Sequence, residues 1–275
     1  MSGFRGDRRH ALCALATLAG AAGSSHADDA PPLRYIAPGT GDRFGSYVLA
    51  LLERVRQRRG LRFQAVPPMQ ITQRRLELEV SRRGGVADLM WGMSNAQRRS
   101  ELRCLEPRLD EGLIGCRLLV VRVDDLARWP ASLATRVLQA RRAGQGLHWP
   151  DVDILRDNGF RVDTAGGTLA LYEMLQRGHI DYFPRSALEV LEELETLDSP
   201  DLTIAPGLML RYPAGNHIFA GRHPQPQVDA LEEQLAQLAR SGEMKRLFDA
   251  AFDPVLRPLG LAGRRSITLH NRRDG

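Results

Sequence analysis

Apolar and polar residues follow two different periods along the chain, and together they predict a mixed α/β fold. Short apolar runs bounded by turn residues are typical of strands. These runs are 33–36, 62–66, 88–91, 118–123, 137–138, 160–163, 180–183, 202–204, 208–210 and 218–220. Between them, apolar residues recur three and four positions apart, as they do on one face of an amphipathic helix. Strands alternating with helices predict largely parallel sheets with helices on both faces.

The strand–helix pattern restarts after Trp129-Pro130, which predicts two α/β lobes rather than one large sheet. A glycine loop, Gly144-Gln145-Gly146, opens the second series, and two amphipathic helices separated by Gly242 close the chain. Residues 254–275 contain prolines and a basic end, so we expect a loosely attached tail there. In such architectures a ligand binds where loops at the carboxyl ends of strands meet.

Charge does not point to a nucleic-acid partner, although the formal net charge of the 275 residues is +5. Residues 1–27 combine a basic start, an apolar stretch and small residues before Ala27, which is the pattern of a secretory signal cleaved after Ala27. Cleavage removes three Arg and one Asp and leaves the mature chain near +3. We therefore expect a periplasmic protein, with the general and the twin-arginine export routes both open because of Arg8-Arg9.

Export changes the interpretation of the cysteines. Cys104 and Cys116 remain after cleavage, and an even number in an oxidising compartment favours a disulfide. The alternative is that both are small buried residues of the core. The two cysteines and the scattered histidines show no metal-binding spacing, and the sequence indicates neither a metal nor a cofactor.

Three segments resemble the type II periplasmic solute-binding proteins of family 3, the branch that binds amino acids and other small polar solutes. Asp88 to Arg98, ahead of Leu105-Glu106-Pro107, is similar to the family's strand, turn, arginine and strand ending in proline. The loop from Gly144 to Asp151 is similar to the start of the family's second lobe. The closing helices with Leu247-Phe248 are similar to the family's carboxyl-terminal ending.

The resemblance implies a two-lobe fold, in which each lobe has a mixed, mainly parallel sheet flanked by helices. Lobe 1 would comprise 28–121 and 214–253, and lobe 2 would comprise 122–213. The chain would cross between the lobes at Leu119–Arg122 and Leu210–Ala214, and the lobes would close on a solute by a hinge motion. The implied partners are a small polar solute and a membrane permease or sensor, with the protein itself a monomer.

Arg98 is the residue that the resemblance marks most clearly. A guanidinium matches a carboxylate with two parallel donors, and the matching arginine of the family does this. Without the resemblance, Arg98 would be a surface arginine. Ser94 stands where the family has a threonine, and Asn95 is the other candidate for that place. Both precede a predicted helix, so each could bind solute, cap the helix or do both.

Further candidates follow the ends of the predicted strands. Trp91 is either a wall of the binding site or a core residue. Asp42 and Phe44 follow the first strand, where Asp42 either accepts an ammonium group or forms a turn. The remaining candidates for solute binding belong to the second series; they are Gln145, Trp149 and Arg185. The alternative for Arg185 is packing or helix capping against Glu189.

No arrangement of catalytic residues is recognisable, so we expect no enzyme. The seven histidines form no convincing acid–base pair, and no serine or cysteine lies in a nucleophile elbow. The sequence therefore predicts an exported receptor that captures an amino acid or related carboxylate for a transporter or sensor. The alternatives are an exported enzyme that uses the same cleft and a signalling or interaction module that has lost its ligand.

Overall fold

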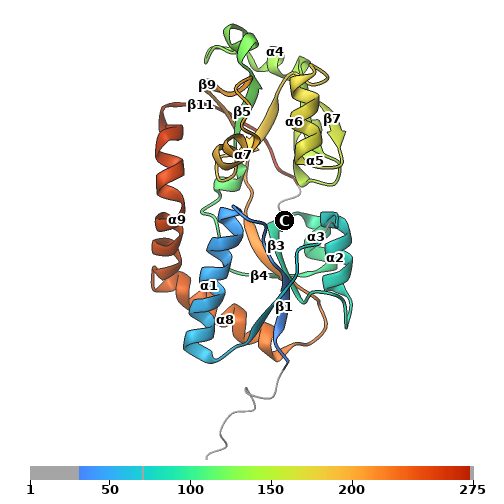
Figure 1. The fold of residues 1–275 in the computed structure, drawn as a ribbon, viewed down its shortest axis with the longest axis vertical. Helices are drawn as coiled ribbons and strands as arrows, with labels where there is room; N and C mark the ends of the chain where they lie inside the picture. Colours follow the sequence, from blue (N-terminus) through green and yellow to red (C-terminus); the bar gives the residue numbers. More distant parts are fainter. Residues whose placement is uncertain (1–30, 70, 273–275) are drawn as a thin grey trace, which may run out of the picture. The chain divides into compact units, whose positions relative to one another are not determined.

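The computed structural model describes residues 31–69 and 71–272, and the predicted signal at 1–27 lies outside them. Two groups of strands organise this part of the chain (Figure 1). A five-stranded sheet has the order β2-β1-β3-β10-β4, and a four-stranded sheet has the order β11-β9-β5-β8. A two-stranded sheet, β6-β7, lies beside the four-stranded one through a bridge between Ala143 and Tyr182. We call the five-stranded sheet and its helices the first lobe, and the other two sheets and their helices the second lobe.

The first lobe is built from both ends of the chain. Its elements are β1 (Leu33–Ile36), α1 (Arg43–Arg59), β2 (Phe63–Val66), α2 (Gln73–Ser81), β3 (Leu89–Met93), α3 (Ala96–Glu101), β4 (Arg103–Leu105), β10 (Asn216–Ala220) and α8 (Pro226–Arg240). Strands β1, β2 and β3 are parallel, whereas β10 runs antiparallel to both β3 and β4. The helix predicted from 48, 51, 52 and 55 is α1, and these four residues are buried.

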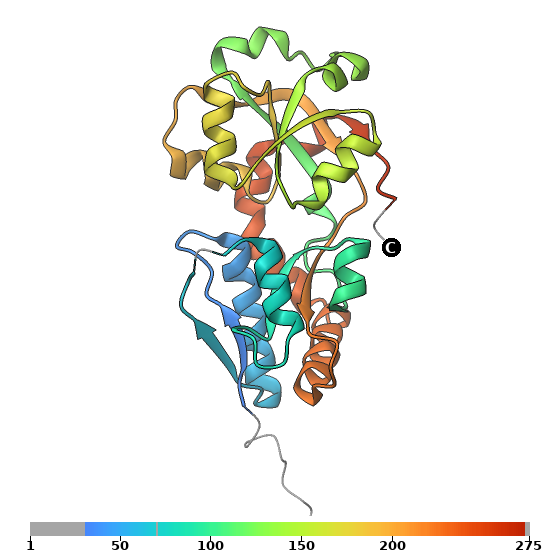
Figure 2. The same cartoon turned by 90° about the vertical axis from the view of Figure 1, so that its right-hand side faces the viewer.

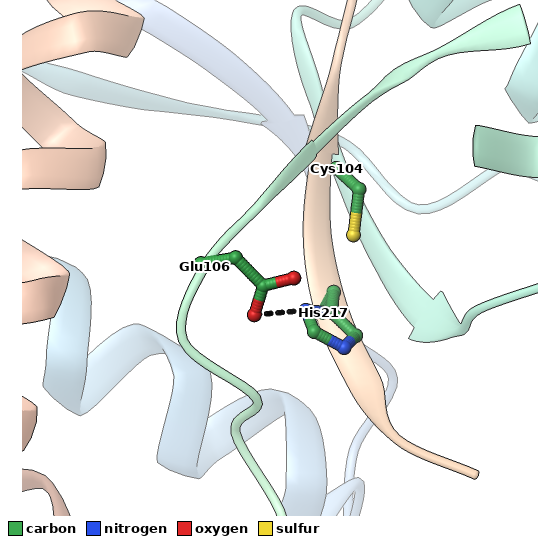
Figure 3. A group of neighbouring side chains, drawn as sticks. All are labelled: Cys104, Glu106 and His217. Atoms are coloured by element: carbon green, nitrogen blue, oxygen red, sulfur yellow. Dashed lines mark ion pairs between the residues drawn. The ribbon is translucent and has the colours of Figure 1, made fainter. Parts of the chain in front are cut away.

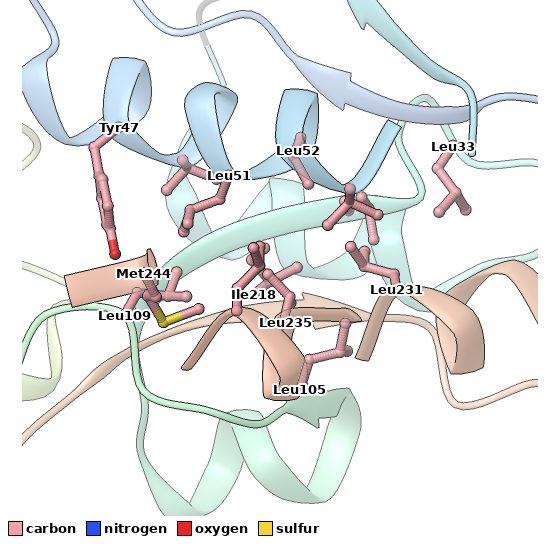
Figure 4. Packing of buried hydrophobic residues seen from close by; sticks show 14 of the residues in the cluster. Leu33, Tyr47, Leu51, Leu52, Leu105, Leu109, Ile218, Leu231, Leu235 and Met244 are labelled. Atoms are coloured by element: carbon pink, nitrogen blue, oxygen red, sulfur yellow. The ribbon is translucent and has the colours of Figure 1, made fainter. Parts of the chain in front are cut away.

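Local signals fix the ends of α1. The side chain of Asp42 accepts a hydrogen bond from the backbone N–H of Gly45 at 2.7 Å, which satisfies one of the free N–H groups at the start of a helix. Gly60 ends the helix with a φ of 66°, a left-handed conformation that glycine adopts without steric cost. The buried face of α1 packs with α8 onto the sheet, and Figure 4 shows Leu51 and Leu52 facing the strand residue Ile218.

Most of the second lobe lies between the two parts of the first lobe in the sequence, and its last strand follows them near the end of the chain. Its elements are β5 (Cys116–Arg122), α4 (Thr135–Ala140), β6 (Arg142–Gly146), α5 (Pro150–Asp157), β7 (Arg161–Ala165), α6 (Thr168–Gln176), β8 (Phe183–Ser186), α7 (Val190–Leu197), β9 (Leu202–Arg211) and β11 (Arg265–Thr268). The sheet β6-β7 is parallel and the four-stranded sheet is mixed, with β5 antiparallel to both of its neighbours, β8 and β9. The expectation of mainly parallel pairing therefore fails at the centre of this lobe.

Several short predictions in the second lobe differ from the structure. Residues 137–138 lie in helix α4, and the two runs 202–204 and 208–210 belong to one strand, β9. The predicted glycine loop is mostly strand β6, where glycine is needed for packing. A Cβ on Gly144 would lie 2.3 Å from Cδ1 of Ile180, and one on Gly146 would lie 2.3 Å from Cε2 of Trp149. Glycine here allows close approach rather than a turn.

The end of the chain is part of the fold, contrary to the expectation of a loose tail after 253. Helix α9 (Glu243–Leu259) buries Phe248 and Phe252 in the core of the first lobe and Leu259 in a core of the second. It continues into β11, which pairs parallel with β9 (Figure 2). The segment Leu119–Arg122 lies within β5, so the chain leaves the first lobe earlier, between β4 and β5.

The predicted disulfide between Cys104 and Cys116 is wrong, because both thiols are free in the structure. The two residues lie on different sheets: Cys104 is opposite Phe219 in the five-stranded sheet, and Cys116 is opposite Arg211 in the four-stranded one. Burial raises the pKa of the Cys104 thiol to about 12. An even number of cysteines therefore did not correspond to a bonded pair.

Candidate functional site

A cavity of about 610 Å³ is lined by residues of both lobes. The first lobe contributes the loop between β1 and α1, the carboxyl end of β3, and single residues from α2 and β10. The second lobe contributes β5, the starts of α5 and α6, β8, and helix α7 with the residue before it. The cavity thus forms at the carboxyl ends of β1 and β3, where α/β proteins place their ligands. Its volume is in the range of small-molecule sites.

Five of the residues predicted from the sequence line this cavity. They are Asp42, Phe44, Trp91, Trp149 and Arg185. Asp42 and Phe44 stand at the start of α1, and Trp91 lies on β3. The other two come from the second lobe, so the predicted residues converge from opposite sides.

The other four predicted residues are outside the lining. Ser94 is fully buried, and Asn95 caps α3 by accepting a hydrogen bond from the backbone N–H of Arg98 at 2.6 Å. Gln145 is also buried and donates to the carbonyl of Pro184 at 3.1 Å. For Asn95, the alternative of helix capping is the one that the structure displays.

Arg98 is engaged elsewhere. Its side chain is 2% exposed, and Nε and Nη2 both donate to Oε1 of Glu77, at 3.0 and 2.6 Å. Its guanidinium carbon lies 5.5 Å from the centre of the Phe219 ring. A Cβ added to Gly92, which lines the cavity, would be 3.2 Å from Nη1 of Arg98, so the guanidinium lies behind the cavity wall. We expected Arg98 to bind a carboxylate of the solute, but in the structure it binds the carboxylate of Glu77.

Arg117 also lines the cavity, and the sequence analysis missed it. It lies on β5 and is 4% exposed, and its Nη2 lies 2.6 Å from Oδ1 of Asp151 in the first turn of α5. Nε donates to the hydroxyl of Tyr212 at 2.7 Å, and that hydroxyl donates to Asp151. Burial opposes the guanidinium charge, but Asp151, Tyr212 and Glu189 together outweigh burial and raise the pKa of Arg117. A signal existed, because an arginine inside an apolar strand needs a buried partner.

A second cluster of charged side chains is centred on Arg185, which lies on β8. Its Nε lies 2.7 Å from Oε2 of Glu193, and its Nη2 lies 3.0 Å from Oε2 of Glu189. The guanidinium carbon is 4.9 Å from the centre of the Trp149 ring. Burial opposes its charge, but Glu193 and Glu189 outweigh that effect and raise the pKa of Arg185 well above its ordinary value. The contact with Glu189, one of the alternatives left open by the sequence, is present in the structure together with the cavity position.

The acidic side chains of α7 complete the wall. Glu192 lies within 3.3 Å of the backbone N–H of Arg43 at the start of α1, so it links the two lobes. The hydroxyl of Tyr172 donates to Glu193 at 2.7 Å. Burial, reinforced by Glu193, raises the pKa of Glu189. Arg185 lies on β8 and Glu193 on α7, so the turn between this strand and helix brings the cluster together.

The balance of charge in the cavity lining is negative. Two guanidiniums, of Arg117 and Arg185, face five carboxylates, which are Asp42, Asp151, Glu189, Glu192 and Glu193. Polar uncharged groups are present too, and Oε1 of Gln73 has no hydrogen-bond partner among the described residues. Phe44, Trp91 and Trp149 add aromatic surface. Such a lining combines flat apolar walls with convergent polar groups, as small-molecule sites do.

Comparison with solved structures identifies the fold. The periplasmic VFT2 domain of BvgS from Bordetella pertussis matches with a TM-score of 0.59 at 20% identity, over 74% of this chain and 82% of that one. The chain has the two-lobe fold of the periplasmic binding proteins. No protein-family model matches the chain, and no curated protein matches it either.

Two further periplasmic-binding-protein-like structures contain different solutes. The GluR0 ligand-binding core of Nostoc punctiforme, in complex with L-glutamate, matches with a TM-score of 0.57 at 17% identity, over 81% of this chain and 100% of that one. An ancestral arginine-binding protein bound to arginine matches with a TM-score of 0.56 at 12% identity, over 75% and 87%. Structures with this fold thus hold an acidic solute in one case and a basic solute in the other. Among the described residues, no helix is both long and apolar enough to cross a bilayer.

Proposed function

We propose that this protein is an exported solute-binding protein and that its cavity takes a small organic cation of the basic amino-acid class. The observation that carries the proposal is the excess of carboxylates over guanidiniums in the lining. Both guanidiniums already have partners: Arg117 is paired with Asp151, and Arg185 with Glu193. A solute of net negative charge would add to the excess of carboxylates in the lining, whereas a solute of net positive charge would be attracted by it.

The charge of the solute is a revision of the expectation from sequence. That expectation rested on Arg98 as the group that holds a carboxylate, and Arg98 is paired with Glu77 behind the cavity wall. The ammonium or guanidinium of a basic solute would instead lie near Glu189, which is 37% exposed and contacts Arg185 and Arg117. The aromatic faces of Trp91 and Phe44 suit the aliphatic stem of such a solute and can also attract its cation.

We infer the wider role from the predicted secretory signal and from the fold. A signal at 1–27 would deliver the mature protein to the periplasm, and the bound solute would pass to a membrane transporter or be reported to a sensor. Solved structures with this fold include both a substrate-binding protein of an amino acid ABC transporter and a histidine kinase sensor domain. An enzyme that uses the same cavity is the main alternative, and turnover of a bound solute separates it, because a binding protein returns the solute unchanged.

A thermal-shift screen tests the charge of the solute. The panel is L-arginine, L-lysine, putrescine, L-glutamate, succinate and glucose. A solute at about 100 times its Kd should stabilise the protein by about 2.7 kcal/mol. We expect stabilisation by the basic members and none by glutamate or succinate. Stabilisation by the anions alone would overturn the proposed charge, and no shift by any member would favour a module without a ligand.

A matched pair of variants places the solute in the cavity. Glu189→Gln removes a carboxylate from the lining, and Glu195→Gln removes an exposed one from the same helix. A hydrogen bond to a charged group contributes about 1.5–3 kcal/mol, so Glu189→Gln should weaken binding at least about tenfold. Glu195→Gln should leave the affinity unchanged in isothermal titration calorimetry. Equal effects of the two substitutions would mean that the solute binds elsewhere.

A further inference from the structure

A second cluster of chemistry-bearing side chains lies on the first lobe, away from the solute cavity. The thiol of Cys104, the carboxylate of Glu106 and the imidazole of His217 each have a ligand atom within 4.8 Å of the others. Figure 3 shows the three side chains directed toward one another, from β4 and the residue after it and from β10. None of the three is among the residues that line the solute cavity.

Strand geometry explains why these residues share one face. Cys104 and Glu106 are two positions apart, so their side chains leave an extended chain on the same side. In the antiparallel pair, Leu105 is opposite Ile218 and Cys104 is opposite Phe219. The same register places His217 opposite Glu106. The residues between them, Leu105 and Ile218, point to the other face and into the core of the first lobe.

The imidazole has a defined orientation. Nδ1 lies 3.1 Å from the carbonyl oxygen of Leu105 and 3.6 Å from the carboxylate of Glu106. The ring nitrogen that faces the carboxylate is therefore Nδ1, while Nε2 faces the guanidinium of Arg99. The ring is 3% exposed and packs edge-on against Phe219, which restricts its rotation.

Arg99 is the cation that now lies beside the cluster, and it is held loosely. Its contacts to Oε1 of Glu106 and to Nε2 of His217 are both 3.4 Å, whereas charge-assisted hydrogen bonds are about 2.7–2.9 Å. Its buried Nε has no hydrogen-bond partner among the described residues. The side chain is 28% exposed, so it can turn toward solvent when another cation takes its place.

We propose that Cys104, Glu106 and His217 bind a zinc ion, with water in the fourth position. Thiolate, imidazole and carboxylate are the three side-chain ligands that zinc accepts, and a site with three protein ligands keeps one position open. Bonds of about 2.0–2.3 Å to zinc bring ligand atoms to roughly 3.5 Å from one another. The cluster must therefore contract by about 1 Å, which Glu106 can supply because its side chain is 59% exposed.

Cobalt absorption is the direct test, because Co²⁺ substitutes for zinc and reports on thiolate coordination. Purified chain without an affinity tag is titrated with Co²⁺ under reducing conditions. We expect a thiolate-to-cobalt charge-transfer band and tetrahedral d–d bands that saturate at one equivalent, and loss of both bands on addition of zinc. Absence of the bands, together with no heat of zinc binding in calorimetry, would overturn the proposal.

Variants assign the ligands. Cys104→Ser should abolish the charge-transfer band, and Cys116→Ser should leave it unchanged because Cys116 lies on the other sheet. Glu106→Gln changes an exposed side chain without disturbing the core, and it should weaken zinc binding by about tenfold or more. Metal binding that survives both Cys104→Ser and Glu106→Gln with unchanged affinity would show that the metal binds elsewhere. These outcomes are independent of any solute in the cavity.

Discussion

Arg117 and Asp151 form an ion pair at 2.6 Å, with side chains 4% and 5% exposed, where β5 and α5 meet at the cavity. Tyr212 bridges the two by accepting from Arg117 and donating to Asp151. Removing one member of a buried pair leaves an uncompensated charge. The two residues therefore line the cavity and also stabilise the second lobe.

The first prediction concerns that pair. Asp151→Asn should lower the free energy of unfolding by about 3 kcal/mol, because Arg117 stays buried with only Glu189, 3.9 Å away, as its counter-ion. Urea unfolding followed by tryptophan fluorescence measures the change. The control is Asp249→Asn, which breaks the exposed pair with Lys245 and should cost about 0–1 kcal/mol. A small, equal effect of both substitutions would contradict the buried pair.

Arg98→Met separates a structural role of Arg98 from a role in solute binding. The substitution leaves the buried Glu77 with only its contact to Arg74 at 3.1 Å, so we expect a loss of about 1–3 kcal/mol of stability. The Kd of the solute identified by thermal shift should stay within about twofold, because the guanidinium lies outside the lining. Calorimetry on the folded variant gives the Kd. Complete loss of binding by a folded variant would restore the role implied by the sequence resemblance.

Asp110 should make stability depend on pH. Burial raises the pKa of its carboxyl to about 6 from an ordinary value of 3.8. The folded state therefore holds a proton that the unfolded state releases, and stability falls as pH rises from about 4 to about 6. A shift of about two units corresponds to about 3 kcal/mol. We expect the stability of the wild type relative to Asp110→Asn to fall by that amount between pH 4 and 7, measured by urea unfolding. A pH-independent difference would refute the assignment.

The carboxyl-terminal strand should be essential to stability. Ile267 on β11 is 6% exposed and belongs to a core of the second lobe. Ile267→Ala should cost about 2–5 kcal/mol, whereas Thr268→Ala, an exposed neighbour on the same strand, should cost little. Thermal and urea unfolding of both variants provide the measurement. Two equally mild variants would indicate that the end of the chain is only loosely attached.

Periodic elements were predictable from sequence, and pairings between distant segments were not. The apolar face of α1 and its polar cap at Asp42 are local signals, so that helix was predicted correctly. The folded structure after residue 253 was not predicted, because its two prolines and basic residues resemble a linker. The apolar partners of Ile267 lie in β9 and β5, which are distant in the sequence. A short strand at the edge of a sheet carries too few residues to show a period.

The same division applies to the cavity. Residues that follow strand ends, such as Asp42 and Trp149, were found because the topology of α/β folds places those loops together. Arg117 was missed because its partner Asp151 is distant in sequence, and Arg98 was overvalued because its partner Glu77 lies on a neighbouring helix. Charge in a sequence shows that a partner is needed, but only the fold shows which carboxylate supplies it.

Helix α9 gives this protein a third covalent connection between the lobes, beside the two strand connections. Pro254 and Pro258 lie inside that helix, and neither can donate a backbone hydrogen bond to the preceding turn. Any rotation of one lobe against the other must therefore bend α9 where these two backbone hydrogen bonds are missing. A hinge motion of the kind expected from the sequence would therefore have to deform α9 as well as the two strand connections.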